Sequence, residues 1–134
     1  MKYFRIQEFV CHCGCGMPAE ARQNIEALVA NVLDPVREAY GKPIYVNSGH
    51  RCKVYNRKVG GVPRSQHLVG EAADIHCDDN AKLAKLIVQQ GRFDQLVIYP
   101  TFLHVSYKRT GLNRHRVLRK TATGYAEISH REIC

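Results

Sequence analysis

The stretch SQHLVGEAAD (65–74) places His67 and Asp74 seven residues apart, with a glycine and two alanines between them. Before it, VGGVPRSQ (59–66) contains two glycines and a proline, which predicts a loop. After it, EAADIHC (71–77) predicts a strand. An imidazole on a loop and a carboxylate on the next strand can be two ligands of one metal ion. They can equally be two side chains that never meet.

The remaining segments predict a mixture of helices and strands. Apolar residues recur at helical spacing from Ala19 to Tyr40, where Pro35 should kink or divide the helix. Residues 4–17 read as irregular, and the segment from Asn113 should add a last strand or helix. The other predicted elements are a helical turn at 52–58, a helix at 78–91, and strands at 44–49, 95–99 and 102–108. This order predicts a single α+β domain over 1–134, with a small antiparallel sheet flanked by helices.

Composition and charge limit the classes of function. Apolar residues make up 45% of the 134 residues, which predicts a globular chain, and the net charge of +8 favours acidic partners. No apolar run approaches the roughly 20 residues that span a membrane, so membrane insertion is not expected. We read no signal peptide, which predicts a protein that is cytoplasmic on synthesis. Any target in the cell wall would then require another route of release.

Cysteines are concentrated near the N-terminus, in the segment 1–17. The run CHCGCG contains Cys11, Cys13 and Cys15 at alternate positions, with His12 between the first two. These side chains could bind a metal, but the run lacks the paired C-x-x-C of common structural zinc sites. Thiols packed in a loop, or a disulfide formed after release, fit the spacing better. At the other end, 109–134 reads as a basic tail.

The predicted strands bring a third metal-ligand candidate to Asp74. Side chains alternate faces along a strand, so Asp74 shares a face with His76, and His104 shares one with Phe102. If the two strands are neighbours, Asp74 and His104 meet, and the loop can fold His67 over them. Two imidazoles, one carboxylate and a fourth position for water are the pattern of a catalytic zinc site.

The motif S-x-H-x-x-G-x-A-x-D resembles the signature of the zinc D-Ala-D-Ala carboxypeptidase family of metallopeptidases. That family includes vancomycin-resistance D,D-dipeptidases and phage L-alanyl-D-glutamate endopeptidases, and hedgehog signalling domains are similar in fold. Further segments agree in order over about residues 8 to 120. They are EFVCHCGCG, LDPVREAYGKPIYVNSGHR, N-x-x-V-G-G-V (56–62) and HVSYK.

The resemblance implies roles for five residues. His67, Asp74 and His104 would bind Zn²⁺, and Arg51 would bind a substrate carboxylate with its planar guanidinium. Ser65 would hydrogen-bond the substrate, orient a ligand or cap the loop. The implied reaction is metal-assisted hydrolysis of a peptide bond in a peptidoglycan stem peptide. The residues do not distinguish D,D-carboxypeptidase, L,D-carboxypeptidase and L-Ala-D-Glu endopeptidase.

The general base is where the sequence departs from the family. Many members have a carboxylate three residues before the last histidine, where this chain has Thr101. Other candidates for the base are Glu71, His76, His50 and Asp94. Tyr99 could donate a hydrogen bond to the developing oxyanion, although a packed hairpin tyrosine is the simpler interpretation.

Three functions therefore compete. The first is a zinc peptidase of the cell wall, such as a phage or prophage endolysin that another protein releases. The second is a non-catalytic binding or assembly module that keeps zinc for structure, which Thr101 favours. The third is a nucleic-acid binder, argued from YKRTGLNRHRVLRK (107–120) alone. That stretch lacks a known binding motif, so nucleic acid is not expected as a partner.

Overall fold

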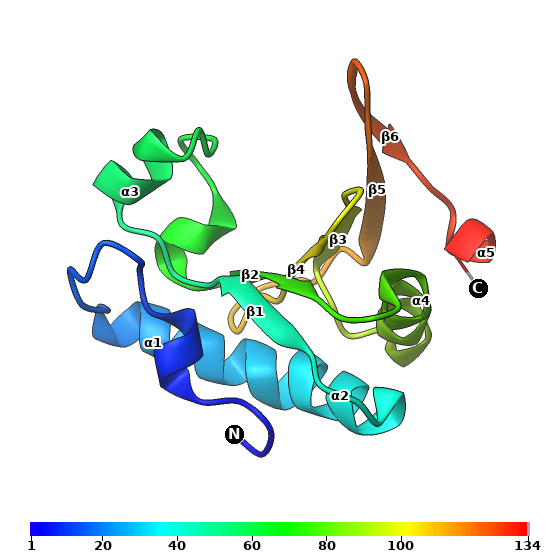
Figure 1. The fold of residues 1–134 in the computed structure, drawn as a ribbon, viewed down its shortest axis with the longest axis horizontal. Helices are drawn as coiled ribbons and strands as arrows, with labels where there is room; N and C mark the ends of the chain where they lie inside the picture. Colours follow the sequence, from blue (N-terminus) through cyan, green and yellow to red (C-terminus); the bar gives the residue numbers. More distant parts are fainter. Residues whose placement is uncertain (134) are drawn as a thin grey trace.

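A six-stranded sheet is the framework of the computed structural model, which describes residues 1–133 (Figure 1). The sixth cysteine, Cys134, lies outside the described residues. The strands lie in the order β1-β2-β4-β3-β5-β6. They are β1 (Tyr45–Ser48), β2 (Ala72–His76), β3 (Gln95–Ile98), β4 (Leu103–Ser106), β5 (Arg116–Thr121) and β6 (Gly124–Glu127).

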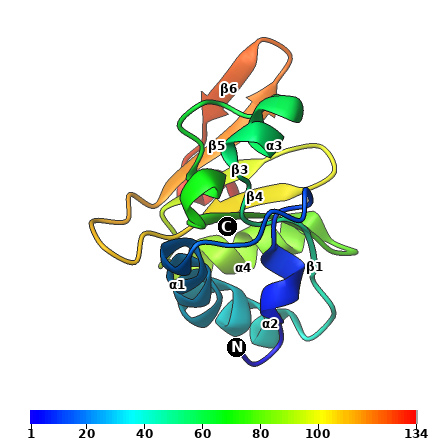
Figure 2. The same cartoon turned by 90° about the vertical axis from the view of Figure 1, so that its left-hand side faces the viewer.

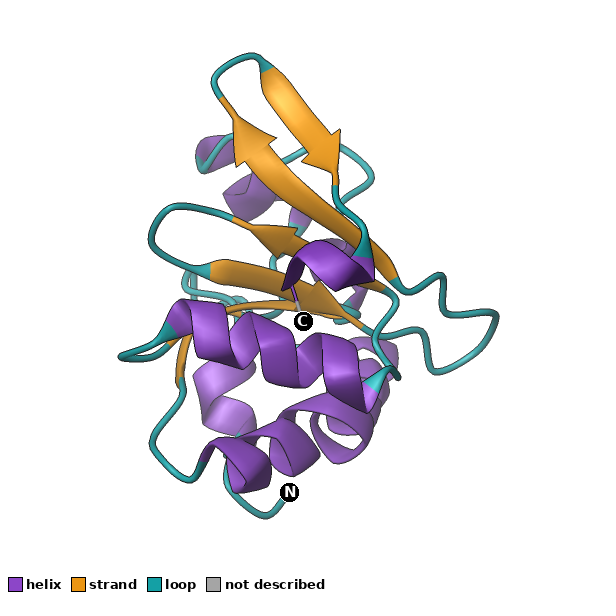
Figure 3. Cartoon of the chain, turned by 90° about the vertical axis from the view of Figure 1, so that its right-hand side faces the viewer, coloured by secondary structure: helices purple, strands orange, loops and turns teal. Residues whose placement is uncertain are grey.

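Helices cover one face of this sheet. Figures 2 and 3 show α1 (Ala19–Leu28), α2 (Asp34–Tyr40) and α4 (Asn80–Gln90) on the same side, with α3 (Lys53–Lys58) beyond the opposite side. The predicted break in the 19–40 helix is a π-helical turn, Val29–Leu33, which places Pro35 in the first turn of α2. A proline is tolerated there because the first amides of a helix have no internal partner.

Strand alternation separates the core from the site. Ile75 on β2 and Leu103 and Val105 on β4 are almost fully buried in the hydrophobic core. Asp74 and His104 occupy the intervening positions, so their side chains point to the face opposite the helices. This face carries the pocket described below.

The C-terminal part differs from the prediction. The α+β class is confirmed, but a purely antiparallel sheet is wrong, because β5 pairs with β3 in parallel, with Leu96 opposite Val117. Asp94 explains the return of the chain: its backbone carbonyl accepts from the Arg116 amide at 2.9 Å, and its carboxylate accepts from the Arg114 amide at 2.8 Å. The basic tail thus supplies β5, β6 and the short helix α5 (His130–Ile133).

Two short 3₁₀ turns were not predicted from the sequence. A 3₁₀ turn, η1 (Ile6–Phe9), lies within 4–17, and its Phe9 is fully buried. A second 3₁₀ turn, η3 (Gln66–Val69), directly precedes β2. Over the residues that the structure describes, none of the helices has the length and apolar character needed to span a bilayer.

Candidate metal centre

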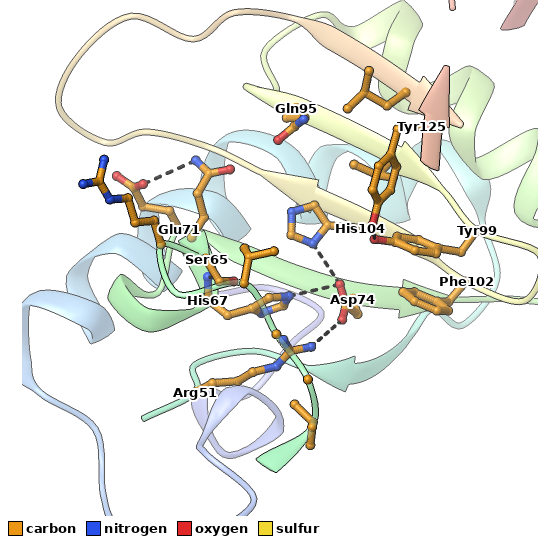
Figure 4. Close-up of a pocket in the computed structure, with 18 of the residues that line it drawn as sticks. Arg51, Ser65, His67, Glu71, Asp74, Gln95, Tyr99, Phe102, His104 and Tyr125 are labelled. Atoms are coloured by element: carbon orange, nitrogen blue, oxygen red, sulfur yellow. Dashed lines mark hydrogen bonds and ion pairs between the residues drawn. The ribbon is translucent and has the colours of Figure 1, made fainter. Parts of the chain in front are cut away.

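Three side chains converge on the open face of the sheet: His67, Asp74 and His104, here called the His–Asp–His cluster. Asp74 and His104 are direct partners across β2 and β4. The Asp74 Oδ1 atom lies 3.0 Å from Nδ1 of His104 and 3.1 Å from Nε2 of His67 (Figure 4). One ligand atom from each residue lies within 4.8 Å of the others. The structure therefore brings together the three residues that the sequence analysis selected.

The turn η3 fixes the position of His67. The Ser65 hydroxyl accepts a hydrogen bond from the His67 amide at 3.1 Å, which caps the turn. Gly70 ends it at φ +77°, and a Cβ there would lie 2.3 Å from the carbonyl oxygen of Ala21 on α1. Only glycine combines this backbone angle with this close approach. The sequence S-x-H-x-x-G thus places an imidazole on a short, anchored turn.

The tautomer of His67 is also set by the fold. Its Nδ1 lies 2.7 Å from the carbonyl oxygen of Gly49, which can only accept, so Nδ1 carries the proton. The other nitrogen, Nε2, is then an acceptor that faces Asp74. Histidine ligands of metals are commonly oriented in this way, by a hydrogen bond from the second ring nitrogen.

Asp74 is negatively charged in this environment. Burial would raise its pKa, but the neighbouring imidazoles of His104 and His67 outweigh burial and hold the pKa well below its usual range. Its second oxygen, Oδ2, pairs with Nη2 of Arg51 at 3.0 Å. Burial lowers the pKa of His104, which favours the neutral imidazole that a metal requires.

Arg51 is held beside the cluster by three contacts. Besides Asp74, its Nε donates to Ser48 at 3.1 Å and its Nη1 donates to Asn56 at 3.3 Å. The buried Asn56 side chain also donates to the Val62 carbonyl at 2.8 Å. Gly61 lies against this pair, since a Cβ there would meet the Asn56 side chain at 2.0 Å. The motif N-x-x-V-G-G-V therefore supports Arg51, a role that the sequence analysis did not assign.

The His–Asp–His cluster lies in a pocket of about 690 Å³ (Figure 4). Basic side chains outnumber acidic ones on its walls: Arg51, Arg64, Lys108 and Arg114 against Glu71 and Asp74. Leu118 of β5 and Tyr125 of β6 also line it. Sequence analysis missed both, because no local signal places the β5–β6 hairpin beside the site. The surplus of positive charge suits an acidic ligand.

The other candidate residues fall into two groups. Glu71 and Tyr99 line the pocket, whereas the pocket-lining residues do not include His50, His76 or Asp94. The Glu71 carboxylate lies 3.4 Å from the side-chain amide nitrogen of Gln66. His76 contacts Asn47 at 2.5 Å and stacks on Tyr45.

His50 and Asp94 are both buried. Nδ1 of His50 has no hydrogen-bond partner among the described residues, and burial lowers the pKa of this side chain. Asp94 is fully enclosed and binds the Arg114 guanidinium through both oxygens, at 3.1 and 2.8 Å. Its carboxylate also accepts from Gln66, the residue before His67. Asp94 therefore connects β3, the segment before β5 and the turn η3.

The geometry of the His–Asp–His cluster fits zinc. Zn–N and Zn–O bonds of about 2.0–2.2 Å in a tetrahedron place ligand atoms about 3.3–3.5 Å apart. The observed separations of 3.0 and 3.1 Å from Asp74 need only a small outward shift. Two imidazoles and one carboxylate leave a fourth position open toward the pocket, which is typical of catalytic sites rather than structural ones.

An α+β fold with this three-ligand cluster in an open pocket is suited to hold a divalent metal ion with one coordination position open to the pocket. A family model described as Peptidase M15 matches residues 2–106, so the chain belongs to this family of zinc peptidases. A zinc D-Ala-D-Ala carboxypeptidase from Streptomyces albus G is 48% identical over 44 residues, which is 32% of this chain but 17% of that protein. The predicted family and its cofactor, Zn²⁺, are thereby confirmed.

Proposed function

We propose that this chain is a zinc carboxypeptidase of peptidoglycan stem peptides, with His67, Asp74 and His104 as the metal ligands. The observation that supports this most directly is the pairing of Arg51 with Asp74 at 3.0 Å. A guanidinium that contacts a metal ligand can bind a carboxylate next to the reacting bond. Zinc held by the cluster would lower the pKa of a bound water to about 7 and polarise the scissile carbonyl.

Arg51 provides the selectivity for a free carboxylate. Its contacts with Ser48, Asn56 and Asp74 use three of its five N–H groups, counting partners within residues 1–133. The remaining two can donate to a substrate carboxylate. Because Arg51 adjoins the ligands, the bond presented to the metal would lie beside a free carboxylate, and we propose that this is the C-terminal carboxylate of the peptide. This favours a carboxypeptidase over an endopeptidase.

Ser65 and Tyr99 are proposed to support the reaction in different ways. Ser65 already accepts from the His67 amide, so it positions a ligand while its own O–H stays available as a donor to substrate. The Tyr99 hydroxyl lies 3.1 Å from that of Tyr125. Burial, this hydrogen bond and the charge of Asp74 raise the pKa of Tyr99, which keeps the phenol neutral. A neutral phenol can donate to a developing oxyanion.

The substrate class is argued from charge. A stem peptide carries free carboxylates, and the pocket walls and the net charge of +8 both favour anions. An anionic cell wall would also attract the protein as a whole. Action on the peptidoglycan of a cell wall is the setting that we propose.

A non-catalytic module of the same fold is the second candidate, and Thr101 favours it. Thr101 is exposed in the β3–β4 connection, where many relatives would place a carboxylate. Among the described pocket-lining residues, Glu71 and Asp74 are the two carboxylates, and Glu71 is turned toward Gln66. Such a module would bind zinc and the peptide without hydrolysing it.

Mass spectrometry of synthetic stem peptides, incubated with and without a chelator, separates these functions. Release of the last D-Ala from a pentapeptide or a tetrapeptide identifies a D,D- or L,D-carboxypeptidase, whereas release of L-Ala identifies an endopeptidase. His67→Ala should abolish release, and His130→Ala, on α5 outside the pocket lining, should not. Bound zinc with no product from any peptide would contradict catalysis and favour the binding module.

A further inference from the structure

A second group of potential metal ligands lies apart from the His–Asp–His cluster. Four sulfur atoms, from Cys11, Cys13, Cys15 and Cys52, all lie within 4.8 Å of one another. We call this group the four-cysteine cluster. Three of its members belong to the N-terminal run CHCGCG, and Cys52 is the residue that caps the start of α3. Figure 1 shows the N-terminal loop passing beside α3, which is how the two segments meet.

The sulfur separations fit a shared metal better than disulfides. Sγ of Cys13 lies 3.2 Å from Sγ of Cys11 and 3.4 Å from Sγ of Cys52, and all four residues have free thiols. A disulfide would require about 2.05 Å. Four sulfurs around a tetrahedral zinc, at about 2.3 Å each, lie about 3.8 Å apart. The separations of 3.2 and 3.4 Å, in a group whose sulfurs all lie within 4.8 Å of one another, are close enough to that value for small side-chain movements to reach it.

Backbone amides already point at these sulfurs. The Cys52 amide donates to Sγ of Cys11 at 3.4 Å, and the Tyr55 amide donates to Sγ of Cys52 at 3.4 Å. Hydrogen bonds of this kind stabilise thiolates and orient metal ligands. Gly14 and Gly16 have φ of +77° and +88°. These backbone angles let the short C-x-C-G-C-G run turn sharply, so that its cysteine side chains face one another.

His12 is not part of this group. Its Nδ1 lies 3.3 Å from the Tyr55 hydroxyl, and the two rings pack at 5.6 Å. The fourth ligand candidate is instead Cys52, more than 35 residues further along the chain. The spacing of the cysteines in the sequence does not predict that Cys52 joins this group, because only the tertiary fold brings it close to the other three.

We propose that the four-cysteine cluster binds a structural zinc ion, at a site separate from the candidate metal centre. Four thiolates close the coordination shell, which leaves no position for substrate, and the displaced thiol protons pass to solvent. The ion fastens the N-terminal segment to residues 49–52. Beside the cluster, the His50 amide also donates to the Phe9 carbonyl at 2.8 Å. Gly49, which orients His67, and Arg51 both lie in the fastened segment.

Metal counting tests the proposal on the full chain, purified under reducing conditions without a chelator. Elemental analysis should give two zinc ions per chain for the wild type. Cys52→Ser keeps a capping hydroxyl at the start of α3 but removes a ligand, and it should bind one. Cys13→Ser, at an exposed position, should also bind one. Cys77→Ala is the matched control, because this buried cysteine lies outside the cluster, and it should bind two.

Cobalt substitution tells the two sites apart without any activity measurement. Four thiolates around Co²⁺ give intense sulfur-to-metal charge-transfer absorption, which two imidazoles and a carboxylate cannot give. This absorption should persist in His67→Ala and disappear in Cys13→Ser. A failed peptidase assay therefore leaves this result intact. The proposal is overturned by one zinc per chain that both serine variants retain, or by a non-reducing mass showing a disulfide within the cluster.

Discussion

Replacement of Asp94 by asparagine should destabilise the protein and change how its stability depends on pH. Asp94 is fully buried, and Arg114 is its ion-pair partner. Breaking a buried pair costs about 3–5 kcal/mol when the remaining charge stays buried. The Arg114 side chain is 41% exposed and can turn to water, so we expect a loss of about 2–3 kcal/mol at pH 7.

The pH dependence gives a sharper magnitude. Burial opposes ionisation of Asp94, but the hydrogen bonds and charge of Arg114, with the amide of Gln66, lower its pKa from 3.8 to about 2. A depressed carboxyl pKa contributes stability above the unfolded value and loses it as pH falls through the folded value. At about 1.4 kcal/mol per pKa unit, the contribution is about 2.4 kcal/mol at pH 5, and about 2 kcal/mol of it is lost by pH 2.

Urea unfolding of wild type and Asp94→Asn, both freed of metal, measures this contribution. Other carboxylates titrate in both proteins and cancel in the difference between the two free energies of unfolding. That difference should shrink by about 2 kcal/mol between pH 5 and pH 2. A difference that stays constant over this range would refute the assigned role of the Asp94–Arg114 pair. A loss of peptidase activity without loss of stability would instead support Asp94 as a base.

Three further outcomes follow from the site. Arg51→Ala should lower kcat/KM about 10–100-fold through KM, as expected for lost charge-assisted hydrogen bonds to a carboxylate, while zinc content stays unchanged; an unchanged KM would remove Arg51 from substrate binding. Tyr99→Phe should lower kcat about tenfold or more with little effect on KM, and equal kinetics of both proteins would exclude the phenol as a donor. Gly70→Ala should cost about 2 kcal/mol or more in thermal unfolding, because its Cβ meets Ala21; wild-type stability would show that α1 gives way.

Local patterns predicted the parts of the fold that place the His–Asp–His cluster. Alternation along β2 and β4 put Asp74 and His104 on the open face, and the two strands are direct neighbours in the sheet. The glycine and serine of S-x-H-x-x-G shaped the turn that brings His67 over them. These features are local, because they depend on strand period and turn chemistry within a few residues. The catalytic roles of these residues remain a prediction.

Pairings between distant segments could not be predicted from the sequence. The parallel placement of β5 beside β3 depends on Asp94, whose partners Arg114 and Arg116 lie about 20 residues later. The periodic spacing of apolar residues does not indicate a buried ion pair of that kind. The same holds for Cys52, which joins the N-terminal cysteines only because the loop before α1 folds against the start of α3.

The segment 48–52 connects the two proposed metal sites residue by residue. Ser48 accepts from Arg51, the Gly49 carbonyl fixes the tautomer of His67, and Cys52 belongs to the four-cysteine cluster. A shift of this segment would therefore misplace a metal ligand and the carboxylate-binding arginine together. A zinc ion bound by the four cysteines would prevent such a shift of segment 48–52. It would do so without contacting the substrate, because four thiolates leave no open coordination position. On this argument, Cys52→Ser should weaken substrate binding even though Cys52 touches no substrate.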